Sequence, residues 1–510
     1  MRLLPSFQTL IALVPLVLFA QAQSKDHAPV LEQPEVPGPV SQESIAKQIE
    51  ELLGAHHAID QLSGSVLVAD KGKVVYQGAF GMANSDWNIP NSADTKFRLA
   101  SVTKQFTSML TMLLVEDGML ELDAPLTKYL PSYPAASGDR VTLTHLLNHT
   151  SGIPSYTDRQ GFFREEGQDT WTVEEFLAKF CSDPLDFDPG TQYHYNNSGY
   201  FLLGAIIEAV TDKTYQAVLQ ERIFQPLGMQ NTGYDDQYGV LANRATGYDD
   251  ILGGRRVSLW LDMTTPYAAG ALYSTVGDLW KWTQALDAKS LLDGDLERLM
   301  FTPGLENYGF GWDIQTEGEG ERAGLAISHS GGMPGVSTLV WRMPELDRTV
   351  IILCNASSPT FSVKGDIVKI LDGLKPRMPA PRGDFVVASI VLAEGIEAAQ
   401  VELARWPQVV KDEYIENDVN RLGYSLLEQR RLDEAIMLFE FLTATYPTSA
   451  NTWDSLGEAH LAAGHVARAI ENYTKALELD PENALIPGIL EKLAARKSRH
   501  GDADPAERVK

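Results

Sequence analysis

Ser101 and Lys104 are the residues of this chain whose types and spacing most directly suggest chemistry. On a helix, residues three positions apart lie on one face, so the Lys104 amine would reach the Ser101 hydroxyl. A serine hydroxyl is a weak nucleophile until a neighbouring base takes its proton. Lysine can be that base where burial lowers its pKa. At the start of a helix, backbone amides would also donate to a developing oxyanion.

The Ser-x-x-Lys spacing is a weak signal by itself, because Ser44 and Lys47 repeat it. In either place it could be an ordinary cap serine followed by a surface lysine. Residues 101–116 have a markedly apolar helical pattern that predicts a buried helix, whereas residues 42–53 form a mixed one. We therefore take Ser101 as the candidate nucleophile.

Tyr195 and Asn197 form a second group, which follows a Pro-Gly turn at residues 188–191. A tyrosine oxygen beside Ser101 could relay a proton to a leaving group. Asn197 could hydrogen-bond a substrate amide and Lys104. The alternative is a loop that only satisfies local backbone groups.

His329, Gly331 and Gly332 form a third group, directly before an apolar run at residues 336–341. A glycine-rich strand edge lets a substrate backbone lie close, in the manner of an added strand. The Gly332 amide could be a second oxyanion donor beside that of Ser101. The alternative is a plain turn that leads into a strand.

His145 and His149 are four residues apart and could present two metal ligands from a helix. No His-Glu-x-x-His pattern is present, and the segment is otherwise apolar. We expect a structural role for both, and we expect neither a metal nor another cofactor.

Strand patterns occur at both ends of the first 375 residues. A hairpin is predicted at residues 64–79, further strands at 308–354 and a closing helix near 363–373, while helix and turn signals dominate between. This order predicts an α+β fold in which the first and last thirds share one sheet.

Pro376, Pro379 and Pro381 mark a boundary, after which the chain reads as helical. Matching residues recur there at an offset of 34: Leu422 and Leu456, Gly423 and Gly457, Ala435 and Ala469, Phe439 and Tyr473, and Pro447 and Pro481. This period resembles the tetratricopeptide repeat. We expect the repeats to pack against a helix near residues 388–406 or against the first domain.

The three groups occur in the order Ser-x-x-Lys, Tyr-x-Asn, His-x-Gly, and together they resemble the class C β-lactamase and penicillin-binding-protein group. Residues 145–153 and 269–279 look like that group too, and the resemblance covers residues 42–372. It implies that Ser101 is acylated, that Lys104 and Tyr195 share the base role, and that Asn197, His329, Gly331 and Gly332 bind substrate. His329 stands where true β-lactamases often have lysine, a permanent cation that can bind a substrate carboxylate, and this departure disfavours efficient recognition of β-lactams or D-Ala-D-Ala.

The N-terminus is typical of a secretory signal, with Arg2, an apolar stretch at residues 10–20 and a cleavage site at 20–22. A secreted or periplasmic location follows, with no membrane span after cleavage. The formal net charge of −26 disfavours nucleic-acid binding. Cys181 and Cys354 could pair, but we expect buried free thiols.

The predicted organisation is a signal peptide (1–22), a Pro-rich spacer (23–41), a β-lactamase/transpeptidase-like domain (42–375), a linker with a connecting helix (376–412), an all-α repeat module (413–500) and a polar tail (501–510). The favoured function is an exported serine hydrolase of small esters, amides or D-amino-acid peptides. A true β-lactamase or D,D-carboxypeptidase is the first alternative. The second is a non-catalytic protein that binds a protein or peptide partner through its repeats.

Overall fold

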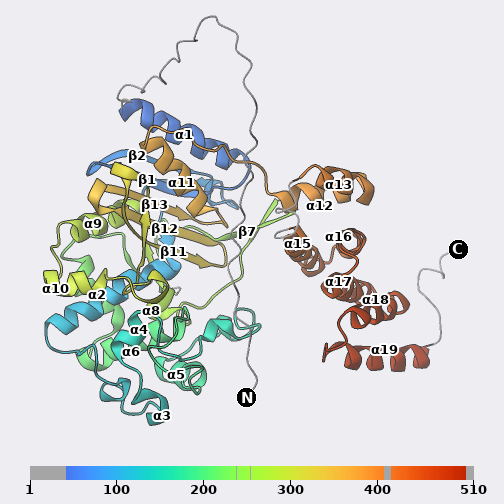
Figure 1. Ribbon diagram of the computed structural model, residues 1–510, viewed down its shortest axis with the longest axis horizontal. Coiled ribbons are helices and arrows are strands. Elements are labelled where there is room, and N and C mark those ends of the chain that lie inside the picture. The colour runs from blue at the N-terminus through green and yellow to red at the C-terminus, as the bar shows by residue number, and fades with distance from the viewer. Residues whose placement is uncertain (1–41, 237, 253, 407–414, 501–510) are drawn as a thin grey trace, which may run out of the picture. The chain divides into compact units, whose positions relative to one another are not determined.

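The computed structural model of the protein describes residues 42–236, 238–252, 254–406 and 415–500. The predicted signal peptide, spacer and polar tail lie outside the described residues. The α+β prediction is confirmed, because an antiparallel sheet flanked by helices is followed by helices alone (Figure 1). Within the described residues no helix combines the length and the apolar character needed to cross a membrane.

The central sheet has six strands in the order β10-β11-β12-β13-β1-β2. They are β1 (Gly64–Asp70), β2 (Lys73–Phe80), β10 (Asp313–Glu317), β11 (Gly324–Met333), β12 (Val336–Met343) and β13 (Arg348–Cys354). β1 pairs with β13 in antiparallel register from Gly64 opposite Cys354 onward. The first and last thirds of the domain therefore share one sheet, as predicted.

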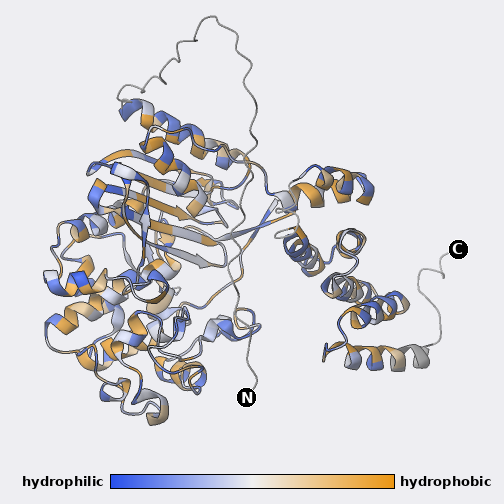
Figure 2. Ribbon diagram, viewed as in Figure 1, coloured by the Kyte–Doolittle hydropathy of each residue, from blue (hydrophilic) through white to orange (hydrophobic). Residues whose placement is uncertain are grey.

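Apolar residues alternate between the two faces of this sheet, whose strands are largely apolar (Figure 2). Val66 and Val68 pack under α1 (Gln42–Ala58) and α11 (Thr360–Leu371) on one face. Leu67 points to the opposite face and joins the core of the helical region. The two faces are visible in Figure 1, with α1 and α11 covering one of them.

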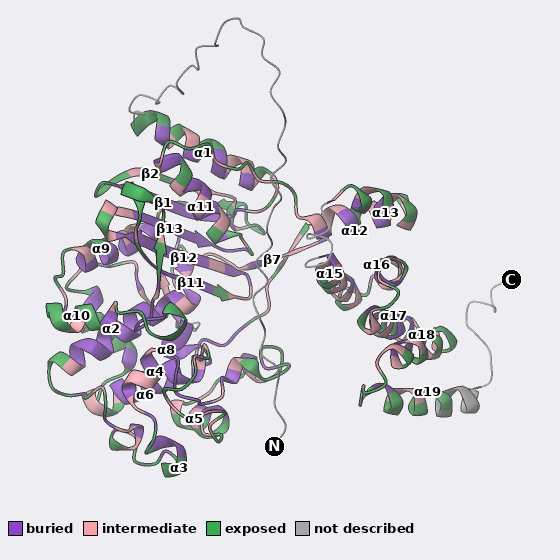
Figure 3. Ribbon diagram, viewed as in Figure 1, coloured by how far each residue is buried: buried purple, intermediate pink, exposed green. Residues whose placement is uncertain are grey.

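The helical region lies between the two strand-rich ends. Its helices are α2 (Thr103–Glu116), α3 (Ala135–Gly138), α4 (Leu143–Leu147), α5 (Val173–Phe180), α6 (Asn197–Thr211), α7 (Tyr215–Leu219), α8 (Tyr267–Gly270), α9 (Val276–Asp287) and α10 (Gly294–Met300). Helix α2 is buried from Thr103 to Leu114, which matches its apolar sequence (Figure 3). Such burial gives any polar group on α2 a low-dielectric environment.

Short strands connect these helices. β3 (Met82–Asn84) pairs with β4 (Ile89–Pro90), β5 (Phe97–Arg98) and β6 (Gly233–Tyr234) flank β9 (Leu272–Ser274), and β7 (Tyr248–Ile251) pairs with β8 (Gly254–Val257). The pair β5–β9 matters most for function, because β5 leads directly into the residues before Ser101.

The C-terminal helices are α12 (Gly383–Glu394), α13 (Ile396–Ala404), α15 (Glu416–Glu428), α16 (Leu432–Thr445), α17 (Ala450–Ala462), α18 (Val466–Leu479) and α19 (Ile486–His500). Gly423 faces the Phe439 ring in one helix pair, and Gly457 faces the Tyr473 ring in the next. The period of 34 residues thus repeats one structural contact.

The connecting segment differs from the single helix expected near residues 388–406. Helices α12 and α13 are separated at Gly395, whose φ of 95° lies in the region that favours glycine. Val387 and Ala388 of α12 share an apolar core with α15 and α16, so the repeats do pack against this segment.

Cys181 and Cys354 are free thiols, and both are buried. Burial raises the pKa of Cys181 to about 12 and that of Cys354 to about 11. Both thiols therefore stay protonated at neutral pH, as expected of small core residues.

Candidate active site

Ser101 lies in a 3-10 turn, Ala100–Val102, that leads from β5 into α2. The Leu99 amide donates to the Leu272 carbonyl at 2.7 Å, which fixes the chain just before the turn. Ala100 has a φ of 48°, a left-handed conformation that costs free energy for a residue other than glycine. The strained turn presents Ser101 at the start of a buried helix.

Lys104 is fully buried one turn further along. Its Nζ lies 3.2 Å from Ser101 Oγ, 2.7 Å from Asn197 Oδ1 and 2.9 Å from the Ala269 carbonyl oxygen. Burial lowers the pKa of the amine well below its usual value. Among the described residues no carboxylate is hydrogen-bonded to the amine, so no counter-charge offsets the effect of burial.

The partners of Lys104 suit a neutral amine. Asn197 Oδ1 and the Ala269 carbonyl accept its two N–H groups. The nitrogen lone pair is then left for the third neighbour, Ser101 Oγ, whose O–H can donate to it. The geometry therefore suits removal of the serine proton by Lys104.

Tyr195 precedes α6, and its hydroxyl is hydrogen-bonded to Ser101. Lys104 Nζ lies 4.9 Å from the centre of the Tyr195 ring. Burial raises the pKa of Tyr195 well above its usual value, more than the Ser101 hydrogen bond lowers it. The phenol therefore keeps its proton at neutral pH and can pass it on.

Asn197 is the first residue of α6, and Asn196 caps that helix by accepting from the Gly199 amide at 2.7 Å. The Asn197 Nδ2 group donates to Thr157 Oγ1 at 2.9 Å, and its backbone amide donates to Ser155 Oγ at 3.1 Å. The side chain is thereby held with its oxygen toward Lys104.

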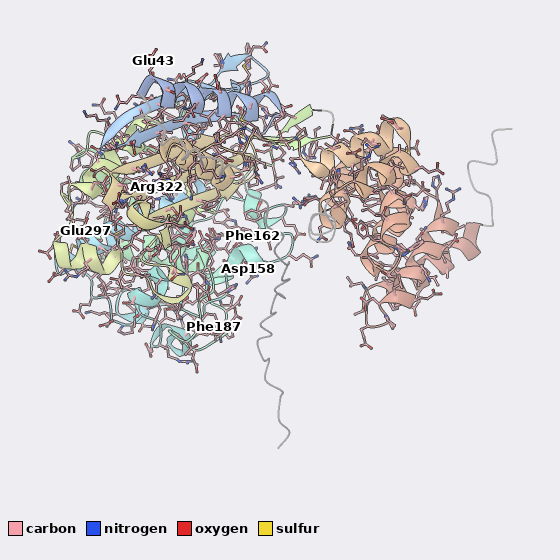
Figure 4. The ribbon with its side chains drawn as sticks, turned by 45° about the horizontal axis from the view of Figure 1, so that its top comes forward. Glu43, Asp158, Phe162, Phe187, Glu297 and Arg322 are labelled. Atoms are coloured by element: carbon pink, nitrogen blue, oxygen red, sulfur yellow. The ribbon has the colours of Figure 1, made fainter. Side chains whose placement is uncertain are left out.

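The segment that contains Thr157 continues to Asp158 and Phe162, which Figure 4 labels. His194 Nε2 lies 3.4 Å from Asp158 Oδ2, and the Phe162 ring packs on Tyr156 with centroids 5.1 Å apart. These contacts hold the wall of the site opposite β11.

β11 supplies the other wall through Gly331 and Gly332. A Cβ atom on Gly331 would lie 2.2 Å from the Leu99 carbonyl oxygen, so only glycine permits this approach of β11 to the turn before Ser101. Gly332 is exposed, and a Cβ there would meet nothing within 4 Å. It borders the open space of the site.

The direction of the Gly332 amide follows from the hairpin register. Pro334 and Gly335 form a two-residue turn between the paired residues Met333 and Val336. The pair that closes such a turn, Met333 and Val336, is hydrogen-bonded. Because hydrogen-bonded and non-hydrogen-bonded pairs alternate, the next pair, Gly332 and Ser337, is non-hydrogen-bonded, so Gly332 directs its N–H away from β12. The pairing of β11 with β10 ends at Ser328. In the described sheet, the edge of β11 beyond Ser328 has no partner strand, so an extended substrate could pair with it.

A pocket of about 50 Å³ lies between these walls. Ser101, Thr157, Asn197 and Gly332 supply its polar side. Its other lining residues are mainly apolar or aromatic: Tyr156, Phe163, Leu261, Pro266, Ala269 and Met333. The space next to Ser101 therefore suits a small apolar group.

His329 lies behind this pocket and not on its surface. Its Nδ1 is 2.6 Å from the Ser330 carbonyl, which can only accept, so Nδ1 carries the proton and Nε2 accepts from the Tyr308 hydroxyl at 2.8 Å. Burial is the main cause that lowers the pKa of His329 to about 3, and Lys104, when protonated, lowers it further. The ring is neutral at physiological pH, and both of its nitrogens have partners.

The structure brings together Ser101, Lys104, Tyr195, Asn197 and Gly332, and it places Gly331 behind the turn and His329 behind the pocket. Sequence reasoning assigned no role to Ala269, Thr157 or Tyr308. Residues 269–279 were singled out by resemblance, and this segment contains Ala269. Its role could not be read from the residue type, because Ala269 acts through its backbone carbonyl, which accepts from Lys104.

His145 and His149 each accept a backbone amide, from Thr142 and Asn196 respectively. His149 packs between Tyr195 and Tyr308, with ring centroids 4.4 and 4.6 Å away. Across the described chain, no three His, Cys, Asp or Glu side chains are grouped so that they could hold a metal ion.

The β-lactamase family model matches residues 47–375, and the tetratricopeptide repeat model matches residues 450–483. The chain therefore belongs to the β-lactamase family, whose fold is used by serine hydrolases. Tetratricopeptide-type helices follow the β-lactamase domain.

Three known proteins illustrate the range of this family. A penicillin-binding protein of Bacillus subtilis (strain 168) is 32% identical over 333 residues, covering 61% of this chain and 71% of that protein. Esterase EstB of Burkholderia gladioli is 36% identical over 187 residues, covering 34% of this chain and 47% of the esterase. The structure of a D-amino acid amidase from Ochrobactrum anthropi SV3 has a TM-score of 0.57 and 26% identity, covering 64% of this chain and 99% of the amidase.

Proposed function

We propose that this protein is a serine hydrolase that forms an acyl-enzyme on Ser101 and cleaves esters and small amides, including those of D-amino acids. The observation that supports it most is the uncharged surroundings of Lys104, whose Nζ lies 3.2 Å from Ser101 Oγ. A buried amine with two fixed acceptors and one hydroxyl neighbour is arranged as a general base.

In the first step, Ser101 Oγ attacks the substrate carbonyl carbon while its proton moves to Lys104 Nζ. The oxyanion accepts from the backbone amides of Ser101 and Gly332. The carbonyl–leaving-group bond then breaks. Tyr195 gives its proton to the leaving group and regains one from Lys104, since its raised pKa favours the phenol.

In the second step, water attacks the acyl carbon of the ester on Ser101. Its proton passes through Tyr195 to Lys104, and Ser101 Oγ leaves with a proton from the same pair. The acid product departs, and the amine and phenol are restored. Atoms and protons balance without a cofactor.

The pocket and the relatives both support this substrate class. The space beside Ser101 is about 50 Å³ and mainly apolar. EstB is named as an esterase, and the Ochrobactrum structure is named as a D-amino acid amidase complexed with D-phenylalanine.

A β-lactamase or D,D-carboxypeptidase is the second candidate, because a curated relative is named as a penicillin-binding protein. The neutral, hydrogen-bonded form of His329 makes this second candidate less favoured than the esterase or amidase. A neutral ring with both nitrogens occupied offers no fixed cation for a carboxylate on the leaving-group side.

A substrate panel tests the proposal. p-Nitrophenyl esters, D-amino-acid amides and nitrocefin are assayed with the wild-type chain and with Ser101→Ala. We expect turnover of esters or amides that is lost in Ser101→Ala. Turnover of nitrocefin alone would favour the second candidate, and turnover that survives Ser101→Ala would contradict the mechanism.

We further propose that the chain is exported and cleaved after Ala22, on the strength of the N-terminal pattern. Mass spectrometry of the mature protein from its native source should find Gln23 as the first residue. Retention of residues 1–22 would contradict this.

We also propose that the helical repeats bind a protein or peptide partner, as tetratricopeptide-type helices suggest. A purely non-catalytic binding role for the whole chain is less favoured, because Ser101, Lys104 and Tyr195 are intact and in contact.

A further inference from the structure

A second pocket of about 380 Å³ lies next to the catalytic pocket. In three parts of the chain, residues that line the second pocket are next to or near residues that line the catalytic pocket. Residues 97–98, 257–260 and 334 line the second pocket, and residues 100–101, 261 and 333 line the catalytic pocket. Arg98 is three residues before Ser101, so their Cα atoms are at most about 11 Å apart. One substrate molecule can therefore reach both pockets.

Two arginines, Arg98 and Arg244, are among the residues that line the second pocket. Arg98 Nε donates to Asp235 Oδ2 at 2.6 Å, and Arg244 Nη1 donates to Asp235 Oδ1 at 2.7 Å. Asp235 is fully buried, whereas the arginine side chains are 19% and 27% exposed. One carboxylate thus neutralises one of two cations.

Arg98 and Arg244 therefore bring one net positive charge to the lining of the pocket. None of the described residues lining it is Asp or Glu. The nearest acid along β7, Asp249, is engaged by the Gly335 amide and lies 3.8 Å from Arg256. The other N–H groups of Arg98 and Arg244 have no acceptor in the described part of the chain.

The second pocket also has an apolar lining. Trp260, Val257, Leu241 and Pro334 supply it, and Trp260 is 49% exposed. The Arg98 guanidinium lies 6.0 Å from the centre of the Trp260 ring. The pocket combines an aliphatic and aromatic surface with one net positive charge.

The catalytic geometry decides which part of a substrate enters this pocket. The leaving group takes its proton from Tyr195, whose ring centroid is 6.2 Å from that of His329. It therefore lies toward the His329 end of the free β11 edge. The acyl group extends the other way, past Leu261 and Met333, toward Pro334 and the second pocket.

We infer that the second pocket binds a terminal carboxylate on the acyl part of the substrate, so that the preferred substrates are esters or amides of acyl groups with a distal carboxylate. This inference rests on the proposed function and names its substrate class. A single uncompensated charge matches a monoanionic carboxylate, which a guanidinium can bind through two parallel hydrogen bonds.

The test compares p-nitrophenyl monoesters of succinate, glutarate, adipate and suberate with neutral esters of the same chain length. We expect one chain length to give kcat/KM roughly tenfold above its neutral counterpart, because a charge-assisted hydrogen bond is gained. Arg244→Gln should bring that ratio close to one, and Arg244→Lys should keep part of it. A ratio near one at every length in the wild type would overturn the inference while leaving the hydrolase intact.

The same variants separate binding from a structural role of Arg244. If Arg244→Gln lowers kcat/KM for charged and neutral esters by the same factor, the residue only supports the fold, and the inference is wrong. Binding is also measured calorimetrically with Ser101→Ala and the monomethyl esters of the same diacids, which does not depend on turnover. We expect weaker binding when Arg244→Gln is added; equal binding would overturn the inference even if no ester is hydrolysed.

Discussion

Lys104 shows how a single residue acquires its chemistry from its neighbours. Its amine has two oxygen acceptors and one hydroxyl around it, and no carboxylate among its hydrogen-bond partners. Burial without a counter-charge disfavours the ammonium form, so the pKa falls well below its usual value. The same spacing at Ser44 and Lys47 lacks these features, because Lys47 is on the exposed part of α1.

Replacing Lys104 tests its role as base. Lys104→Ala should lower kcat/KM by about 10²–10⁴-fold, the usual contribution of a general base. In the wild type, kcat/KM should fall as the pH drops through the lowered pKa of Lys104, because the protonated amine cannot accept the serine proton. The acidic limb of the pH profile should therefore lie well below pH 10.5. Lys104→Arg introduces a permanent cation that cannot act as base. Activity in this variant with the same acidic limb as the wild type would contradict the assignment.

His329 should affect stability through pH. Its pKa is 6.5 when unfolded and about 3 in the fold. As the pH falls from 6.5 toward 3, the unfolded chain takes up a proton that the native chain does not, so stability is lost over that window. In thermal unfolding, the melting temperature of His329→Gln should fall less steeply between pH 6.5 and 4 than that of the wild type, because glutamine does not titrate in this range. An identical pH dependence in both proteins would show that His329 does not titrate in this way.

The contact of Ser101 with Lys104 could be predicted from the sequence, because helical spacing alone brings residues three apart together. The position of Tyr195 rested on resemblance, since no local rule joins residues 94 positions apart. The placement of His329 behind the pocket could not be predicted. It depends on the Tyr308 hydroxyl, which comes from a segment whose sequence carries no corresponding signal.

At the scale of elements, the approach of β11 to the turn before α2 creates the site. Thr338 on β12 donates to the Leu99 carbonyl at 2.8 Å, through the gap that Gly331 leaves open. Strand, turn and helix are thereby fixed to one another at the nucleophile.

Two adjacent glycines should respond differently to the same substitution. Gly331→Ala places a methyl group 2.2 Å from the Leu99 carbonyl oxygen, so the free energy of unfolding should fall by about 1–3 kcal/mol, as in overpacked cores. Gly332→Ala meets no atom within 4 Å and should change stability by at most about 0.5 kcal/mol. Chemical denaturation measures both. Equal losses would contradict the position of β11.

The repeats offer a second matched pair. An alanine at Gly423 would lie 2.5 Å from the Phe439 ring, whereas an alanine at Gly457 would lie 3.1 Å from the Tyr473 ring. Alanine is favoured over glycine in a helix by about 0.5–1 kcal/mol, which offsets the milder contact but not the closer one. Gly423→Ala should therefore lower the melting temperature of the helical module, and Gly457→Ala should leave it nearly unchanged. The reverse order would contradict the packing described for the two helix pairs.

The elements themselves were predictable where their patterns were long. The hairpin at β1 and β2, helix α2 and the repeat helices follow from apolar periodicity and the offset of 34 residues. The break at Gly395 and the short strands β5, β6 and β9 were not predicted, because a two- or three-residue strand carries too few residues to show alternation.

At the scale of the whole molecule, the β-lactamase-like region and the helical repeats are linked through the hairpin of β7 and β8. Leu252, between these strands, is buried in the apolar core of α12, α15 and α16, and its carbonyl accepts from Arg431 Nη1 at 3.0 Å. Strand β8 continues into residues 257–261, which line both pockets. The net charge of −26 makes a nucleic-acid partner unfavourable for the chain as a whole.

Trapping the acyl-enzyme is the most direct test of the account. The wild-type chain is mixed with a slowly hydrolysed p-nitrophenyl ester, quenched in acid and measured by intact-protein mass spectrometry, followed by peptide mapping. We predict a mass increase equal to one acyl group, located on Ser101 and absent from Ser101→Ala. An adduct on another residue, or ester hydrolysis at the wild-type rate by Ser101→Ala, would contradict the claim that Ser101, Lys104 and Tyr195 form a catalytic unit.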